Sequence, residues 1–399
     1  MNNTISNRIK ASTSLWSSYV RILASAVFFS RLGSGLLSGI ATNFYVDILG
    51  LSGKEVLWLA GIREIPGLAL VFIAALIMHW PLSRRAGISL ILMGLGYGLY
   101  ATVQSYLALI AVALIGSVGF HNWAPMQSAL GMGLTDKAHS GRVLGFLASM
   151  GSLAAIVGMG LSAALASSFN LRTFYAIGGV LMVVGGILVF QIPVSIGKQS
   201  KPQPRFFLHK RYWLYYVLTF FEGSRMQVFG AFNTLVLVQQ YGLNAGQISL
   251  ILLLSSVVNF IFAPRLGHLL DSIGERLTLT SSYVVLALCF IGYATVHNVW
   301  FLSAMLICIN LMVALRIGLS TYVNRIAPPD ELAPTLTAGV SINHITSVSM
   351  SFLAGILLSI VGYEWLSFGA AMVIFASVPF AMAIKTQAVP KSELQIQHT

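Results

Sequence analysis

The chain has 399 residues, of which 57% are hydrophobic and only 9% are charged. Soluble domains carry about 25% charged residues, so this composition excludes a soluble protein. The formal net charge is +12, but the Lys and Arg residues stand in short loops between apolar segments, which is the pattern of a multi-pass membrane protein. We therefore expect membrane lipid as a partner and no nucleic acid.

Twelve apolar segments follow one another along the chain, each long enough to cross a bilayer, which takes about 20 residues. They lie at residues 17–48, 54–78, 86–104, 106–130, 142–168, 172–192, 212–240, 246–268, 277–296, 299–322, 335–360 and 363–385. Most connections are short, so consecutive helices should be antiparallel neighbours. The sequence predicts an all-α membrane protein with two pseudo-symmetric bundles of six transmembrane helices.

The longest connection, Pro193 to Arg211, holds three prolines and five basic residues and divides the chain in two. We therefore expect an N-terminal bundle at residues 1–192, a basic linker at 193–211, a C-terminal bundle at 212–385 and a tail at 386–399. The remaining basic residues show which side the linker occupies. By our count 17 of the 23 Lys and Arg residues lie on the side of the linker and termini, and only Lys54 and Arg172 lie opposite. Because basic loops stay in the cytoplasm, we expect cytoplasmic termini in a bacterial inner membrane.

The two halves repeat each other. Gly50 and Gly242 follow matching segments at an offset of 192 residues, and Asp136 and Asp330 match at an offset of 194. Transporters built from two repeats place the substrate site near the midplane between them. The sequence therefore directs the search for a site to the centre of the bundle.

The stretch from Gly267 to Arg276 reads GHLLDSIGER: a glycine, an acid four residues on, then a glycine and a basic residue. It resembles the signature loop of the major facilitator superfamily, and the six-plus-six arrangement with a basic central loop is similar to that family over nearly the whole chain. The resemblance implies the family's fold and a secondary transporter. It also implies that Asp271, Gly274 and Arg276 act in gating. The first-half copy, residues 79–85, lacks the acid and the turn glycine.

Six charged residues lie deep within the apolar segments, away from the segment ends: Arg31, Arg63, Glu64, Glu222, Arg225 and Arg316. An ionised side chain at the bilayer centre costs about 2.5–3.5 kcal/mol on insertion scales, so these residues should face protein or water. Glu222 and Arg225 are three residues apart and share a helix face. The four arginines exceed the two glutamates by two positive charges, which indicates that an anion binds at this depth.

The resemblance implies that the first, fourth, seventh and tenth segments line the central cavity. The substrate-binding residues that we expect on them are Arg31, His121, Arg225, Asn233 and Arg316. The planar fork of arginine binds carboxylate and phosphate oxygens in pairs. Family members that carry phosphorylated sugars and inorganic anions use an arginine on the first and on the seventh segment, and the positions here are similar. We therefore expect a small organic or phosphorylated anion as substrate.

The two acids deep in the membrane are the candidates for coupling transport to protons. Burial raises the pKa of a carboxyl group and a nearby arginine lowers it. That competition suits a residue that binds and releases a proton. We expect Glu222 to carry the coupling proton, with Glu64 as the second candidate. Exchange against a counter-anion, without protons, stays open.

Other interpretations stay open as well. Arg31 and Arg316 could form structural ion pairs with the two acids, and His121 and His344 could be satisfied core residues. The cavity would then suit a proton-driven exporter of amphipathic drugs. A non-transporting membrane sensor or scaffold is a third reading.

No catalytic or nucleotide-binding motif is found. Cys289 and Cys308 lack the spacing of a metal site. We expect no enzymatic activity, no cofactor, no metal and a monomer.

Overall fold

Ser17 begins the first long helix, because its hydroxyl accepts a hydrogen bond from the backbone N–H of Val20 at 3.3 Å. The computed structural model describes residues 17–70, 76–77, 79–136, 139–196 and 208–385. The predicted tail at 386–399, the central part of the linker at 197–207 and the basic residue Lys137 lie outside the described residues. The predicted bundle boundaries at residues 192 and 212 stay predictions.

The first half contains six membrane crossings. Its helices are α2 (Ser18–Asn43), η1 (Phe44–Ile48), α3 (Gly53–Ile62), α4 (Ile65–Leu68), α6 (Leu82–Gly98), η2 (Leu99–Ala101), α7 (Tyr106–Gly133), α8 (Ser140–Leu165) and α9 (Leu171–Val189). The second crossing is interrupted between α3 and α4, where Pro66 stands in the first turn of α4. Proline fits a helix start because its nitrogen has no hydrogen to donate.

The second half also contains six crossings. Its helices are η3 (Lys210–Tyr212), α10 (Trp213–Tyr241), α11 (Ala245–Thr295), α12 (Val299–Ala314), α13 (Ile317–Ile326) and α14 (Pro329–Met382). Helices α11 and α14 each turn back at a glycine with positive φ, Gly274 at 79° and Gly362 at 78°, so each supplies two crossings. The described residues contain no strand. The predicted all-α fold with twelve crossings is confirmed, and boundaries differ from the prediction by a few residues.

The repeat predicted from the sequence is visible in the backbone. Gly50 and Gly242 take nearly the same left-handed conformation, with φ of 66° and 67°. Thr42 and Thr234, which are also 192 residues apart, meet through their hydroxyl oxygens at 2.7 Å. Equivalent residues of two repeats can touch only at the axis that relates the halves, so this contact marks that axis.

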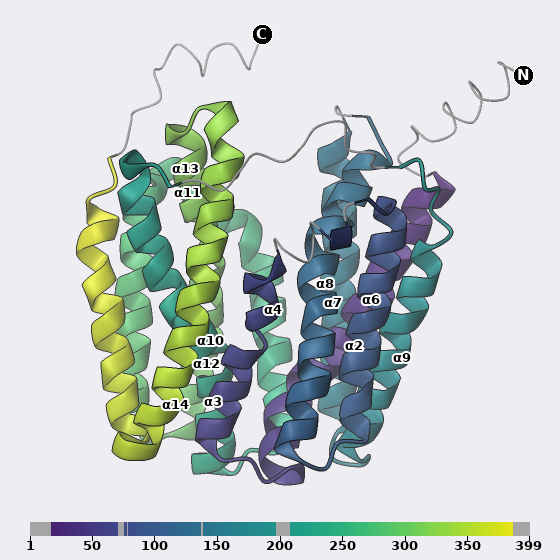
Figure 1. Ribbon diagram of the computed structural model, residues 1–399. Coiled ribbons are helices and arrows are strands. Elements are labelled where there is room, and N and C mark those ends of the chain that lie inside the picture. The colour runs from purple at the N-terminus through teal and green to yellow at the C-terminus, as the bar shows by residue number, and fades with distance from the viewer. Residues whose placement is uncertain (1–16, 71–75, 78, 137–138, 197–207, 386–399) are drawn as a thin grey trace, which may run out of the picture.

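The two halves are joined from the midplane to the side opposite the linker, the lower side of Figure 1, where α3 lies between them. Asn43 donates to the carbonyl of Leu243 at 2.9 Å, and Trp58 donates to the carbonyl of Phe352 at 3.1 Å. Among the described residues, no hydrogen bond joins the halves on the linker side. The protein is therefore closed on the side away from the linker, which we name the far side.

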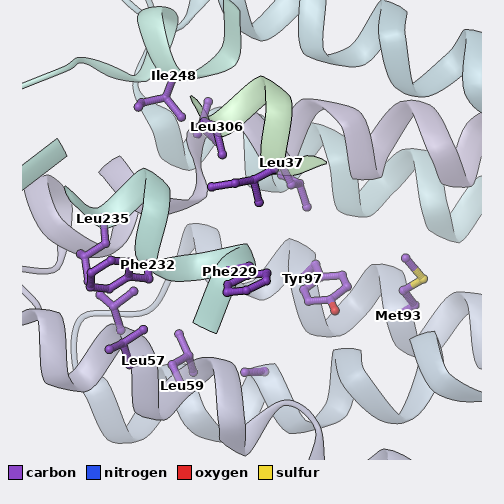
Figure 2. Close-up of a cluster of buried hydrophobic side chains, with 14 of the residues drawn as sticks. Leu37, Leu57, Leu59, Met93, Tyr97, Phe229, Phe232, Leu235, Ile248 and Leu306 are labelled. Atoms are coloured by element: carbon purple, nitrogen blue, oxygen red, sulfur yellow. The ribbon is translucent and has the colours of Figure 1, made fainter. Parts of the chain in front are cut away.

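Buried apolar side chains of both halves form one continuous cluster that extends through the bundle. Figure 2 shows Leu57 and Leu59 of α3 beside Phe229 and Phe232 of α10. In lipid, apolar burial favours helix contacts weakly, and close approach of small residues contributes more. Gly39 of α2 illustrates this, because a Cβ added there would lie 2.7 Å from the Cβ of Ser249 on α11.

We predict that Gly39→Ala opens the far side. The added methyl group would also lie 2.9 Å from the Cα of Ser249, and overpacking of this kind costs about 1–3 kcal/mol. Labelling of a Thr234→Cys reporter by an impermeant maleimide, in a chain whose two native cysteines are replaced by serine, should become about 5- to 150-fold faster.

Gly145→Ala is the matched control, since a Cβ at Gly145 meets nothing within 4 Å. Labelling should be unchanged in that protein. Equal labelling rates in the two variants would contradict the role of Gly39 in closing the far side.

Candidate functional site

The interruption of the second crossing places Arg63 and Glu64 at mid-depth, between α3 and α4. The broken helix leaves the carbonyl oxygen of Arg63 free for other donors. The Ser117 hydroxyl donates to it, and Nε2 of His121 lies 3.3 Å away. Two side chains of α7 therefore contact the carbonyl oxygen of Arg63 at the break.

A cavity of about 260 Å³ lies within the first half, and we name it the arginine cavity. Arg31 of α2 and Arg63 line it together. The other polar residues of its lining are Ser34, Ser38, Tyr45, Tyr97, Tyr100 and Tyr175. Arg63 donates to the Tyr97 hydroxyl at 3.1 Å, and its guanidinium carbon Cζ lies 5.4 Å from the centre of that ring. The cavity thus combines two cations with hydroxyl groups and aromatic faces.

Neither arginine of the cavity forms an ion pair with an acid among the described residues. Within the described part of the chain, no carboxylate oxygen lies within 4.0 Å of the guanidinium of Arg31 or Arg63. The buried Nε of Arg63 has no hydrogen-bond partner there either. Arg31 is exposed and also lines a second cavity of about 400 Å³, together with Gln127 and Ser128. The arginine cavity therefore carries positive charge that its own walls leave uncompensated.

Arg225 has a different environment. It is 5% exposed, forms an ion pair with Glu222, and its Cζ lies 4.0 Å from the ring centre of Tyr283. The pair predicted from the spacing of Glu222 and Arg225 is thus formed, and it is electrically neutral. Arg31 and Arg225 do not mirror each other, because Arg31 lines a cavity and Arg225 is enclosed with its own acid.

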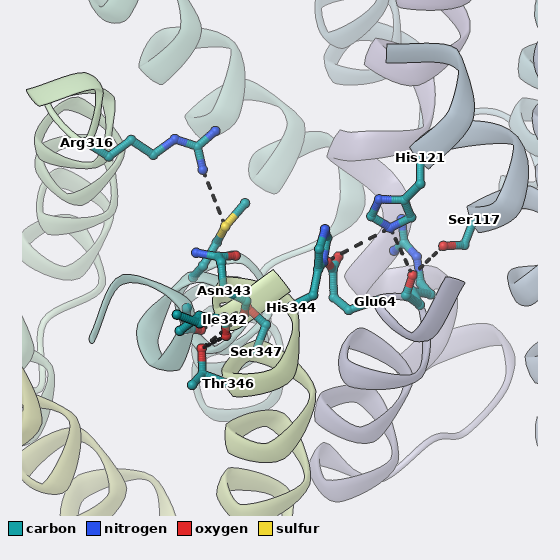
Figure 3. A network of polar contacts seen from close by, with 12 residues as sticks. Glu64, Ser117, His121, Arg316, Ile342, Asn343, His344, Thr346 and Ser347 are labelled. Carbon is teal, nitrogen blue, oxygen red and sulfur yellow. Dashed lines mark hydrogen bonds and ion pairs between the residues drawn. The ribbon is translucent and has the colours of Figure 1, made fainter. Parts of the chain in front are cut away.

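The other predicted substrate residues are spread over the molecule. Arg316 is exposed at the junction of α12 and α13, and its Nη1 lies 3.4 Å from the sulfur of Met226, as Figure 3 shows. Asn233 is fully buried, donates to the carbonyl of Phe229 in its own helix at 3.0 Å, and is not in the lining of the arginine cavity. The substrate roles of these residues stay predictions.

Glu64 meets two histidines in what we name the Glu64 cluster, which consists of Glu64, His121 and His344. Nδ1 of His344 lies 2.8 Å from Oε2 of Glu64, and Nε2 of His121 lies 3.9 Å from the same oxygen. The ring centres of the two histidines are 5.1 Å apart. Because His344 belongs to α14, this contact crosses from one half to the other (Figure 3).

The four tyrosines of the arginine cavity were missed by the sequence analysis. Tyr97 and Tyr100 are three residues apart and face the same side of their segment, which was an available signal. Tyr45 and Tyr175 come from other segments, and their rings join this group only in the fold. The centres of the Tyr100 and Tyr175 rings are 5.0 Å apart.

The predicted gating loop turns at Gly274, where φ is 79°. Asp271 and Arg276 are exposed, and neither has an ion-pair partner among the described residues. Glu275, which also lies in this loop, is 2% exposed. Its Oε1 lies 2.8 Å from Nε of Arg325 at the end of α13. Sequence reasoning overlooked Glu275 because its partner is 50 residues away. Gating by the loop stays a prediction.

A family model described as the Major Facilitator Superfamily matches residues 23–221 and 215–398. The comparison with curated proteins finds no match.

Several solved structures share the architecture. A mutant of the nucleoside transporter NupG has a TM-score of 0.78 and 16% identity, covering 92% of this chain and 100% of that one. A bacterial homologue of the human lysosomal transporter Spinster has a TM-score of 0.73 and 11% identity, covering 92% and 96%. The human organic anion transporter MFSD10 has a TM-score of 0.55 and 12% identity, covering 91% and 98%. At these identities the likeness shows the fold alone.

We predict that Glu222→Gln destabilises the protein by about 3–5 kcal/mol, because removing one partner leaves the buried Arg225 charge uncompensated. The double variant Glu222→Gln/Arg225→Gln should recover part of this loss. Chemical unfolding in detergent measures both. The matched control is Glu364→Gln, which breaks an exposed pair with His297 and should change little. Equal losses in Glu222→Gln and Glu364→Gln would contradict this account.

Proposed function

Because the chain belongs to the Major Facilitator Superfamily, it is a multi-pass membrane transporter of a small molecule and not an enzyme, and we propose that it carries a small organic or phosphorylated anion by alternating access. The observation that carries this proposal is the arginine cavity. Two guanidinium groups line it, and neither has a described carboxylate oxygen within 4.0 Å.

Electrostatics in the membrane favours an anionic ligand for this cavity. Each uncompensated cation at the bilayer centre costs about 2.5–3.5 kcal/mol on insertion scales. A bound carboxylate or phosphate would remove much of that cost by pairing with Arg31 and Arg63, whose forked guanidinium groups match its oxygens. The cavity charge thus provides both the attraction and the selectivity for negative solutes.

The remaining lining supports a substrate with an organic body. Four tyrosines offer hydroxyl donors and ring faces, and Ser34 and Ser38 of α2 add two more hydroxyl groups. Pockets for drug-sized ligands are about 300–1,000 Å³, whereas the arginine cavity is about 260 Å³. A compact metabolite therefore fits this cavity better than a large drug.

The second half would supply further positive charge as the transporter cycles. Arg316 is exposed and lacks a carboxylate partner among the residues that the structure describes. Arg225 is neutralised by Glu222, so protonation of Glu222 would release the charge of Arg225 toward an anion. This coupling of one proton to one substrate charge is the mechanism that we propose for symport.

Orientation follows from charge and from the closed side. We propose that the termini and linker lie in the cytoplasm of a bacterial cell, because by our count 17 basic residues lie on that side against two opposite. The halves are hydrogen-bonded toward the far side. In this arrangement the arginine cavity belongs to the inward-facing state.

One observation favours a second candidate function, the export of amphipathic drugs. An apolar cavity of about 170 Å³ lies between α10 and α14, with Phe229, Met350 and Leu353 in its lining beside Arg225. An amphipathic cation could place its apolar part there. The two candidates differ in whether the arginines are required.

We predict that Arg31→Gln and Arg63→Gln each reduce anion uptake into proteoliposomes about 10- to 150-fold, since a hydrogen bond to a charged group contributes about 1.5–3 kcal/mol. The anion is chosen first, by thermal-shift screening of carboxylates, sugar phosphates and cationic dyes. Arg265→Gln, at an exposed position, is the control and should transport normally. Unimpaired anion uptake, or arginine-independent dye export as the sole activity, would overturn the proposal.

We predict that Glu222→Gln separates exchange from uphill transport. If Glu222 carries the coupling proton, the variant should retain at least a tenth of wild-type anion counterflow at equal pH but lose accumulation driven by a pH gradient. Proteoliposomes loaded with the same anion measure both activities. Uphill transport equal to that of wild type would refute the assignment, and a parallel loss of both activities would indicate a structural role only.

A further inference from the structure

We propose that Glu64, His121 and His344 form a binding site for a divalent transition-metal ion, with Zn²⁺ as the reference ion. The three residues come from three different elements: the break between α3 and α4, helix α7, and the first part of α14. Two imidazoles and one carboxylate are a ligand set that Zn²⁺ uses in proteins. This proposal is independent of the anion proposed as substrate.

The ligand atoms lie close to the spacing that a metal needs. One ligand atom of each residue lies within 4.8 Å of those of the other two. Oε2 of Glu64 is 2.8 Å from Nδ1 of His344 and 3.9 Å from Nε2 of His121. Metal–ligand bonds of 2.0–2.2 Å in a tetrahedron put ligand atoms roughly 3.3–3.5 Å apart. The two observed distances lie on either side of that value, so small side-chain rotations would complete the site.

The surroundings hold the ligands in place. The side chains of the cluster are 10–13% exposed, so they are enclosed but still reachable. Gly67 of α4 makes room for His344, because a Cβ there would lie 2.8 Å from Nδ1 of that ring. Metal binding would withdraw Nε2 of His121 from the carbonyl of Arg63, which keeps its hydrogen bond from Ser117.

Charge also favours a cation at this point. With both imidazoles neutral, the cluster carries the negative charge of Glu64, and only His344 is within hydrogen-bond distance of that carboxylate among the two histidines. Arg63, the preceding residue, directs its Nη2 to the Tyr97 hydroxyl at 3.1 Å, and its guanidinium forms no ion pair with Glu64 within 4.0 Å. Three protein ligands leave a fourth tetrahedral position for water or an anion.

The location of the site defines its effect. Glu64 and His121 belong to the first half and His344 to the second, so a bound ion joins the halves in the conformation that is closed on the far side. A ligand that binds one conformation shifts the population toward it. The site would therefore act as an inhibitory clamp, which arrests alternating access when Zn²⁺ binds.

Binding is tested on the purified full-length chain with Cys289→Ser and Cys308→Ser, because these two thiols lie within reach of each other and could hold the same metal. Titration calorimetry with ZnCl₂ should show one saturable site. His344→Gln, His121→Gln and Glu64→Gln should each weaken the Zn²⁺ affinity at least 10- to 100-fold. His297→Gln removes a histidine from an exposed Glu364 pair of equal length, 2.8 Å, and should leave the affinity unchanged.

Two further measurements keep the test decisive if a ligand variant folds poorly. Gly67→Ala retains all three ligands but displaces the His344 ring, and it should also weaken Zn²⁺ binding. In the cysteine-free protein, Co²⁺ should give the visible absorption of a tetrahedral site without a thiolate band. Lack of saturable binding, or an affinity in His344→Gln equal to that in the starting protein, would overturn the metal site.

The clamp is tested without any substrate. Labelling of the Thr234→Cys reporter on the far side by an impermeant maleimide should fall several-fold when ZnCl₂ is added and recover with a chelator. His344→Gln should remove this protection. Binding that leaves the labelling rate unchanged would refute the clamp, and protection that persists in His344→Gln would assign the effect to a different metal site.

Discussion

A guanidinium group inside the bilayer must pair with another group or face a cavity within the protein, and this constraint explains the arrangement of the charges. The protein meets it in two ways. In the second half Arg225 is enclosed with Glu222 as a neutral pair. In the first half Arg31 and Arg63 line a cavity whose walls supply hydroxyl groups and rings but no described carboxylate within 4.0 Å. One half therefore pairs its buried arginine with an acid, and the other has two arginines in a cavity lining without a described carboxylate partner.

The break between α3 and α4 sets the positions of Arg63 and Glu64. The gap between α3 and α4 frees the carbonyl of Arg63 and turns Arg63 and Glu64 toward different partners. A continuous helix would send adjacent residues about 100° apart and keep every carbonyl bonded within the helix. The break allows Arg63 to reach the arginine cavity, while Glu64 reaches His344 in the other half. One interruption of the chain thus places Arg63 in the lining of the arginine cavity and Glu64 in the contact between the halves.

Prediction from the sequence was strong where the signal is local. The twelve crossings follow from runs of apolar residues, and the repeat follows from the offset of Gly50 and Gly242, which share a left-handed conformation. The ion pair of Glu222 with Arg225 follows from a spacing of three residues. The partner of Glu275 could not be predicted, because 50 residues and a change of helix separate it from Arg325.

The sequence by itself determined that this protein crosses the membrane twelve times, that its halves repeat, and that positive charge is in excess at its centre. Those properties depend on composition, periodicity and spacing, which the chain carries in linear form. Only the tertiary structure decided which arginines have acids of their own, that four tyrosines surround Arg31 and Arg63, and that Glu64 and His121 meet His344. Helix packing sets these outcomes, because side chains far apart in sequence come together only when particular helix faces meet.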